Sequence, residues 1–299
     1  MVTRVRLGIA ATLTAAALYG SVPALVRGAF DNGVPAVESS FFRTSVIAVV
    51  LAAVAVARNA SFAVPRAGWK SFTLLAVATL AISMTYLAAV QFIPVALAAI
   101  VFYSFPIIIL IIAPLVEGHS PGVSAIFLGL FAFAGLAIAI GPGFGALDPR
   151  GIVLAAAASA GAALQAFAGR AISRHLEPAA FGSLVHATIW LPSLLIVLWL
   201  GSGEIRSLPG GAATPAGYAC VLALSLLYVG AYFFHMQSLT YAPASVVAPF
   251  FNLEPIVTIA IAALVLGERL ALNQYLGGAM VLAALIVSSL LSRTGPATG

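Results

Sequence analysis

The sequence has very little charge: only 7% of its 299 residues are Asp, Glu, Lys or Arg. Because an average soluble domain carries about 25% charged residues, this chain has too few to cover the surface of a water-soluble fold. A single cysteine, Cys220, excludes an intrachain disulfide. The basic residues are scattered singly, so the net charge of +5 does not indicate a nucleic-acid partner.

Hydrophobic residues, in contrast, make up 63% of the chain. They form runs of roughly 20 residues, which is the length that a helix needs to cross a bilayer. The alternating pattern of a membrane β-barrel is absent, so we predict a polytopic helical membrane protein. The expected spans are 7–26, 36–57, 69–90, 95–116, 123–140, 152–172, 181–200, 216–239, 245–266 and 272–291.

The two halves of the chain are related. A shift of 149 residues places Pro94 on Pro243 and Pro106 on Pro255. Each half contains five predicted spans, and an odd number inverts the second half relative to the first. Inverted repeats are typical of secondary transporters that bind their substrate between the halves. We therefore predict an all-α fold of ten transmembrane helices, in which two inverted five-helix repeats, 1–146 and 147–299, surround a central cavity.

The distribution of basic residues predicts the orientation of the chain. An excess of Lys and Arg marks cytoplasmic loops, and this excess falls on the side that contains both termini. The predicted cytoplasmic residues are Arg4, Arg6, Arg58, Arg66, Lys70, Arg170, Arg174 and Arg293, and those of the opposite side are Arg27, Arg150, Arg206 and Arg269. Arg4 and Arg6 before an apolar run also fit a signal peptide, but its removal would leave the sixth span without its repeat partner. The expected location is a bacterial-type inner (plasma) membrane.

Several motifs recur in the two halves of the chain. The second half contains the sequence Asn-Leu-Glu-Pro at 252–255, the turn Leu-Gly-Glu-Arg at 266–269 and the pair Gly277-Gly278. The first half follows the same plan, except that its turn reads Val-Glu-Gly-His at 116–119, which aligns His119 with Glu268. These motifs resemble the EamA family of the drug/metabolite transporter superfamily. The resemblance covers nearly the whole chain and implies ten helices, a central cavity and export of small metabolites, commonly amino acids.

Polar side chains mark the faces that we expect to line this cavity, since a polar group in mid-membrane must face protein or water. In the eighth span Ser225, Tyr228, Tyr232 and His235 share one helical face, and in the third span Thr79, Ser83 and Tyr86 occupy repeat-equivalent places. The seventh span has a similar face with Ser183, His186, Trp190 and Ser193. The other expected cavity residues are Tyr19, Tyr103 and Asn252. Interhelical hydrogen bonding is the alternative role for such stripes.

Two prolines and two charges complete the candidate residues. Pro106 and Pro255 lie near the centres of the fourth and ninth spans, where proline removes a backbone donor and kinks a helix. Paired interrupted helices indicate a transport site, so we expect a hinge or gate there. Arg43 and Glu254 are charges inside spans, and each needs a partner or a wet cavity. Arg43 is expected to hold a substrate carboxylate or to pair with Glu38 or Glu254, and Glu254 is a candidate coupling group.

The leading functional prediction is a secondary transporter that exports small neutral or zwitterionic metabolites, most of all amino acids. A phosphometabolite or nucleotide-sugar antiporter would need several cations in its cavity, and Arg43 is the only one expected inside a span. An intramembrane enzyme would need a catalytic or metal motif, and the sequence has none. The expected partners are a small-molecule substrate and the lipid bilayer, for a monomer or homodimer without a cofactor or metal. The fifth and tenth spans, rich in small residues, are expected to lie outside the cavity.

Overall fold

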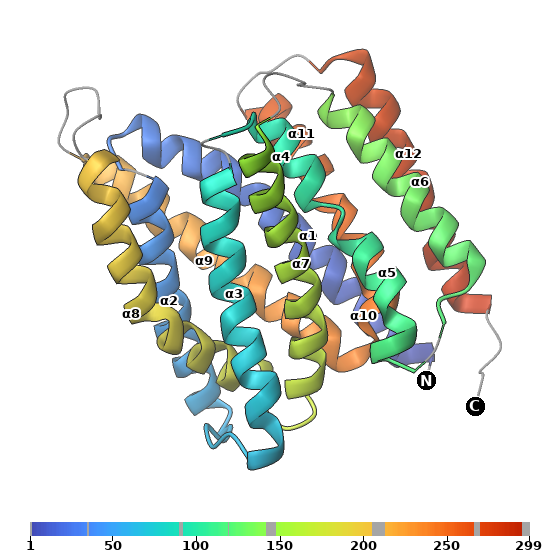
Figure 1. Ribbon diagram of the computed structural model, residues 1–299, viewed down its shortest axis with the longest axis horizontal. Coiled ribbons are helices and arrows are strands. Elements are labelled where there is room, and N and C mark those ends of the chain that lie inside the picture. Colours follow the sequence, from blue (N-terminus) through green and yellow to red (C-terminus); the bar gives the residue numbers. More distant parts are fainter. Residues whose placement is uncertain are drawn as a thin grey trace.

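A computed structural model describes residues 2–34, 36–89, 92–118, 120–141, 148–204, 213–265 and 270–294. Everything within these ranges that is regular is helical (Figure 1). Some residues of the sequence argument lie outside the described ranges. They are His119, Arg206 and the four residues of the second turn, Leu266, Gly267, Glu268 and Arg269.

The helices follow the predicted spans closely. They are α1 (Val2–Asp31), α2 (Ala36–Ala57), the short 3-10 helix η1 (Arg66–Gly68), α3 (Trp69–Ala89), α4 (Val95–Phe102), α5 (Phe105–Val116), α6 (Val123–Ile140), α7 (Pro149–Ile172), α8 (Pro178–Glu204), α9 (Pro215–Tyr241), α10 (Ala244–Val247), the 3-10 helix η2 (Ala248–Asn252), α11 (Leu253–Val265) and α12 (Leu272–Thr294).

Among the described residues, nine segments are long and apolar enough to cross a membrane. The tenth segment is α2, whose strongly apolar part, Phe41–Ala57, is shorter. Its first turns contain Glu38 and Arg43, which lower the hydropathy of a helix that is still 22 residues long. Since about 20 helical residues span the hydrocarbon core, these segments confirm the all-α polytopic fold.

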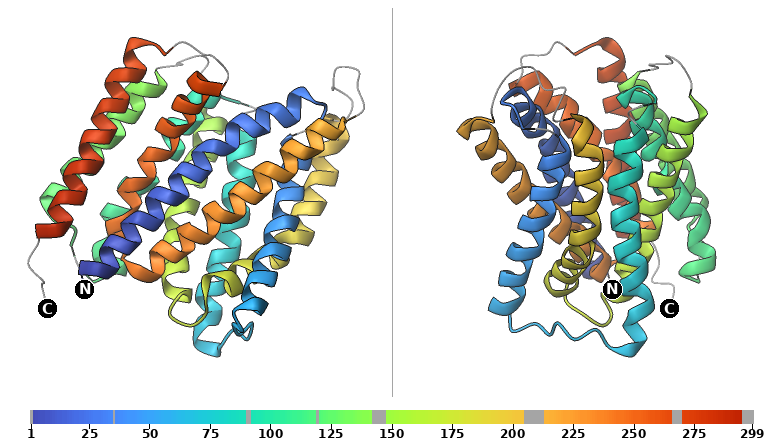
Figure 2. Two further views of the ribbon diagram at one scale, coloured as in Figure 1. Left: turned by 180° about the vertical axis from the view of Figure 1, so that it is seen from behind. Right: turned by 60° about the vertical axis from the view of Figure 1, so that its left-hand side comes forward.

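Helix packing follows the repeat relationship. The main contacts join α1 to α9, α3 to α7, α2 to α8 and α6 to α12 (Figures 1 and 2). A shift of 149 residues turns α1 into α7 and α9 into α3, so the first two pairs are copies of one another. The other two pairs each join a helix to its own equivalent. Both termini lie at the same end of the bundle, as an even number of spans requires.

The fourth and ninth spans are both broken in the middle. In the first repeat α4 ends at Phe102 and α5 begins at Phe105, with Pro106 in its first turn. In the second repeat η2 ends at Asn252 and α11 begins at Leu253, with Pro255 in its first turn. Proline is tolerated there because the first turn of a helix has no internal partner for its N–H. The interruption therefore precedes each proline, at repeat-equivalent positions.

Helices α6 and α12 lie side by side along one edge of the bundle (Figure 1). Glycine permits their close approach: a Cβ atom on Gly277 would lie 2.2 Å from the carbonyl oxygen of Gly135 and 2.4 Å from the amide nitrogen of Ala139. Small residues at a crossing point let membrane helices pack backbone to backbone. This pair fastens the two repeats together away from the centre.

Candidate substrate cavity

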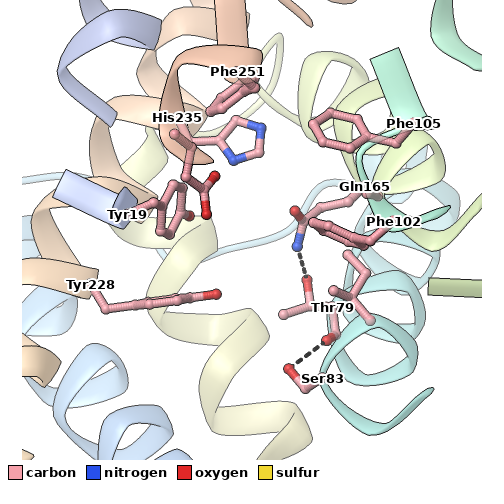
Figure 3. A pocket seen from close by; sticks show the side chains of 12 residues that line it. Tyr19, Thr79, Ser83, Phe102, Phe105, Gln165, Tyr228, His235 and Phe251 are labelled. Atoms are coloured by element: carbon pink, nitrogen blue, oxygen red, sulfur yellow. Dashed lines mark hydrogen bonds between the residues drawn. The ribbon is translucent and has the colours of Figure 1, made fainter. Parts of the chain in front are cut away.

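A cavity of about 120 Å³ lies in the middle of the bundle, where the two broken spans meet. Figure 3 shows its side chains pointing toward one another from both repeats. The lining residues are Tyr19, Thr79, Ile82, Ser83, Phe102, Phe105, Ala162, Gln165, Tyr228, His235, Phe251 and Glu254. They come from α1, α3, α4, α5, α7, α9, η2 and α11. None of them belongs to α6 or α12, nor to α2 or α8.

The two helix breaks supply equivalent pairs of residues to this cavity. Phe102 and Phe251 occupy the last turn before each break, and Phe105 and Glu254 follow it. The members of each pair are 149 residues apart. The cavity is therefore symmetric in backbone but not in chemistry, because a phenyl ring in the first repeat corresponds to a carboxyl group in the second.

One wall of the cavity carries short polar groups. The Thr79 hydroxyl donates to the carbonyl oxygen of Leu75 at 2.7 Å and accepts from Nε2 of Gln165 at 2.9 Å. The Ser83 hydroxyl donates to the carbonyl oxygen of Thr79 at 3.1 Å. The bond from Gln165 to Thr79 joins α7 to α3, and the other two lie within α3. The Gln165 amide oxygen and the lone pairs of Ser83 remain as acceptors for a ligand (Figure 3).

The opposite wall is aromatic. The rings of Tyr19 and Tyr228 meet edge to face with centroids 4.9 Å apart. The imidazole of His235 lies 6.2 Å from the Tyr19 ring and 4.5 Å from the Phe251 ring. Such pairs fix each ring by packing from α1, α9 and η2 (Figure 3). This wall presents flat apolar faces with a few polar edges.

The two charges predicted inside spans have different surroundings. Glu254 lines the cavity, and the Tyr103 hydroxyl lies within hydrogen-bonding reach of its carboxyl group. Arg43 stands behind the aromatic wall, with its guanidinium carbon 4.2 Å from the centre of the Tyr228 ring. Among the ion pairs of the described residues, none joins Arg43 to Glu38 or to Glu254.

The remaining predicted site residues lie outside the lining. His186 donates from Nδ1 to the carbonyl oxygen of Gly182 at 2.8 Å and packs edge-on against Tyr232, which is 1% exposed. The Trp190 indole donates to the Ser45 hydroxyl at 2.9 Å on the α2–α8 contact. Tyr86 packs behind Phe102, with ring centroids 5.2 Å apart. The Asn252 amide donates to the carbonyl oxygen of Pro249 inside the second break.

Six candidates thus meet at one cavity: Tyr19, Thr79, Ser83, Tyr228, His235 and Glu254. The sequence analysis missed Gln165. An amide side chain in the middle of the alanine-rich helix α7, the sixth predicted span, is a signal that could have indicated it. Also missed were Phe102, Phe105 and Phe251, for which periodicity gives no signal because apolar residues face lipid equally well. In the described part of the chain, no group of three or more His, Cys, Asp or Glu side chains is arranged to hold a metal ion.

At the end of the bundle that holds both termini, the broken spans touch. The Glu117 carboxylate, just after α5, accepts from the backbone N–H of Ala244 at 2.6 Å and from the Ser245 hydroxyl. Nearby, the Arg170 guanidinium donates to the carbonyl oxygen of Leu239. Helix α5 also packs on α10, whereas α4 and α11, their equivalents at the other end, share no comparable packing in the described residues. The two broken spans therefore contact each other more closely on the side of the termini.

Comparison with known proteins gives three findings. The model of the EamA-like transporter family matches two segments, 6–141 and 149–290. A solved structure described only as "Crystal structure of protein" is similar in fold, with a TM-score of 0.82 and 17% sequence identity over 96% of this chain and 98% of that chain. No curated protein matches the sequence. The two matched segments together cover almost the whole chain, one for each repeat.

Proposed function

Because this chain belongs to the EamA-like transporter family, and is thus a multi-pass membrane transporter, we propose that it exports small neutral or zwitterionic metabolites, with amino acids as the leading class. The observation that carries this proposal is the cavity at the junction of the two helix breaks, lined from both repeats. Broken helices at matching places in inverted repeats are the usual position of a transport site.

The lining supports an amphipathic solute. Aromatic faces of Tyr19, Tyr228 and Phe251 suit an apolar side chain or an ammonium group. Gln165 and Ser83 offer hydrogen bonds on the other wall. The volume of about 120 Å³ is below the roughly 300–1,000 Å³ of sites for drug-sized ligands, so the cavity suits only a small solute. Export, as opposed to uptake, is part of the proposal and is supported by the resemblance to the family.

Transport would proceed by alternating access. We propose that the contact between Glu117 and the start of α10 closes one end of the cavity, so that it would have to separate before solute passes that way. When this contact separates, α4 would close on α11 at the opposite end, because each repeat would then adopt the conformation that the other repeat had before. Pro106 and Pro255 would act as hinges between the halves of their spans, and the moving units would be the repeats 1–146 and 147–299.

The closed end is proposed to be cytoplasmic. Both termini lie there (Figure 2), as do Arg58, Arg66 and Lys70, which flank the link between α2 and α3. An excess of basic residues marks the cytoplasmic side of a membrane protein. We propose a bacterial-type inner membrane as the location. Helices α6 and α12 would lie at the periphery of a monomer, or would form the subunit contact of a homodimer.

Phosphorylated solutes fit the cavity poorly. No Lys or Arg is among its lining residues, and Arg43 is separated from it by the Tyr228 ring. A phosphate would lose its hydration without gaining cationic partners.

Efflux from liposomes tests the proposed function. Purified protein would be reconstituted, the vesicles loaded with each of a broad panel of radiolabelled amino acids, and the loss of label compared with protein-free vesicles. Protein-dependent efflux of at least one amino acid is the expected result. Absence of such efflux across the panel would remove amino acids as the substrate class.

A further inference from the structure

The charged groups of the cavity are of one sign. Among the described residues that line it, Glu254 is the only Asp or Glu, and there is no Lys or Arg. No ion pair joins Glu254 to a basic side chain within the part of the chain described here. A carboxylate in mid-membrane without a cationic partner is costly. A cationic ligand would therefore be bound more strongly here than an anionic one.

The surroundings of Glu254 favour an organic cation over a bare metal ion. Phe105, Phe251 and Tyr19 line the same cavity, and aromatic faces attract an ammonium group that also has apolar substituents. The Tyr103 hydroxyl, from the first repeat, lies near the carboxyl group. A metal ion would need several oxygen ligands, and the cavity offers one carboxyl group.

The carboxylate of an amino acid finds no such partner. The guanidinium of Arg43 is covered by the Tyr228 ring at 4.2 Å. The Thr79 hydroxyl already donates to Leu75. What remains on that wall is the Gln165 side chain, whose amide nitrogen donates to Thr79, and the Ser83 hydroxyl, which donates to its own helix. These groups can bind a neutral polar group at that end of the ligand as readily as a carboxylate.

We propose that the feature this cavity requires of its ligand is a protonated amine, which binds at Glu254 between the aromatic rings, and that a carboxylate on the ligand is dispensable. The proposal rests on the proposed function, because it takes the cavity as the transport site. It narrows the substrate class to amines, amino acids and their amides, and it excludes acids whose amine is blocked. Glu254 is the residue that sets this specificity.

The test compares three forms of each ligand. Purified protein in detergent would be titrated with alanine, leucine, methionine, phenylalanine and threonine, with the amide of each and with the N-acetyl derivative of each, while thermal unfolding is followed. A ligand that binds the folded state raises the apparent melting temperature by mass action. We expect the amide of every stabilising amino acid to stabilise as well, and its N-acetyl derivative to give no shift.

Variants assign the effect to the carboxyl group. Glu254→Gln keeps the size and removes the charge, and we expect it to weaken amine binding by about tenfold or more, since a charge-assisted hydrogen bond is lost. Glu254→Asp keeps the charge and should restore part of the affinity. Glu177→Gln is the matched control, because Glu177 is an exposed carboxylate paired with Arg58 on the surface. If Glu254→Gln fails to fold, Tyr103→Phe serves as the second variant. It keeps the ring and removes the hydroxyl near Glu254, and we expect it to weaken amine binding a few-fold.

Each result decides the question. N-acetyl derivatives that bind as well as the amino acids would overturn the proposal, and so would a folded Glu254→Gln protein with parental affinity for amines. The same holds if no amine stabilises the parent protein. None of these results touches efflux from liposomes, so an exporter with a different recognition rule would still be seen as an exporter.

Discussion

At the scale of single residues, Tyr228 links the cavity to the charge behind its aromatic wall. Its ring covers the Arg43 guanidinium on one side, meets the Tyr19 ring on another and lines the cavity itself. The ring meets the half-buried Arg43 guanidinium through its face rather than its hydroxyl. Removing the ring therefore changes both the shape and the charge of the cavity.

We expect Tyr228→Ala to lower the rate of efflux from liposomes by about tenfold or more, because a cation–π contact and an aromatic wall are lost together. Tyr228→Phe should retain most of the activity, since the ring faces persist. Folding of both variants would be checked by their melting temperatures without ligand. Equal loss in the two variants would show that the hydroxyl, and not the ring, is what matters.

Sequence reasoning placed part of this site and missed the rest for identifiable reasons. The polar stripes of the third and eighth predicted spans, which are α3 and α9, predicted Thr79, Ser83, Tyr228 and His235, because a polar group inside the membrane must face away from lipid. The same rule cannot say which neighbour a stripe faces. His186 and Trp190 are polar in the same way, but His186 donates to Gly182 of its own helix and Trp190 donates to Ser45 of α2. A role for them in transport stays a prediction.

At the scale of elements, the positions of the spans could be predicted within a few residues because apolar length alone sets them. The form of the fourth and ninth spans could not. Proline predicts a kink, but the helix ends before it, at Phe102 and at Asn252, with the proline in the first turn of the next helix. Local preference for proline in a first turn decided this outcome over a simple bend.

The breaks give a prediction about hinges. Pro106→Ala supplies an N–H that can bond to the Phe102 carbonyl oxygen and continue α4 into α5. We expect efflux to fall roughly tenfold with the protein still folded, because the hinge stiffens. Pro255→Ala should behave alike, since the second break is equivalent. Pro114→Ala, near the end of α5, is the control and should transport like the parent, and similar losses at all three prolines would argue against a special role for the breaks.

The crossing of α6 and α12 gives a prediction about stability. Gly277→Ala should destabilise the protein by about 1–3 kcal/mol, because the added methyl group meets backbone atoms of Gly135 and Ala139 that have no room to move. Gly278→Ala is the matched control, since its Cβ would lie 3.9 Å from Ile256. Thermal or denaturant unfolding in detergent measures both. Equal stability of the two variants would mean that the helices do not cross this closely.

At the scale of the whole molecule, the two repeats follow the same chain path, but the contacts between their broken spans differ at the two ends of the bundle. At the end that holds both termini, Glu117 joins the fourth span to the start of the ninth, and the equivalent packing is missing at the other end among the residues described. One backbone plan in two copies can adopt either arrangement, and this is the physical basis for alternating access. Solute would enter and leave through ends that open in turn.

A reversible cross-link across the closed end tests this account most directly. In a Cys220→Ala background, cysteines at Glu117 and Ser245 would be joined by a short cleavable bifunctional thiol reagent, and efflux from liposomes measured before and after cleavage. The account predicts that the cross-link stops efflux and that cleavage restores it, whereas either cysteine alone is unaffected by the reagent. Efflux at an undiminished rate from fully cross-linked protein would contradict alternating access through the cavity between the repeats.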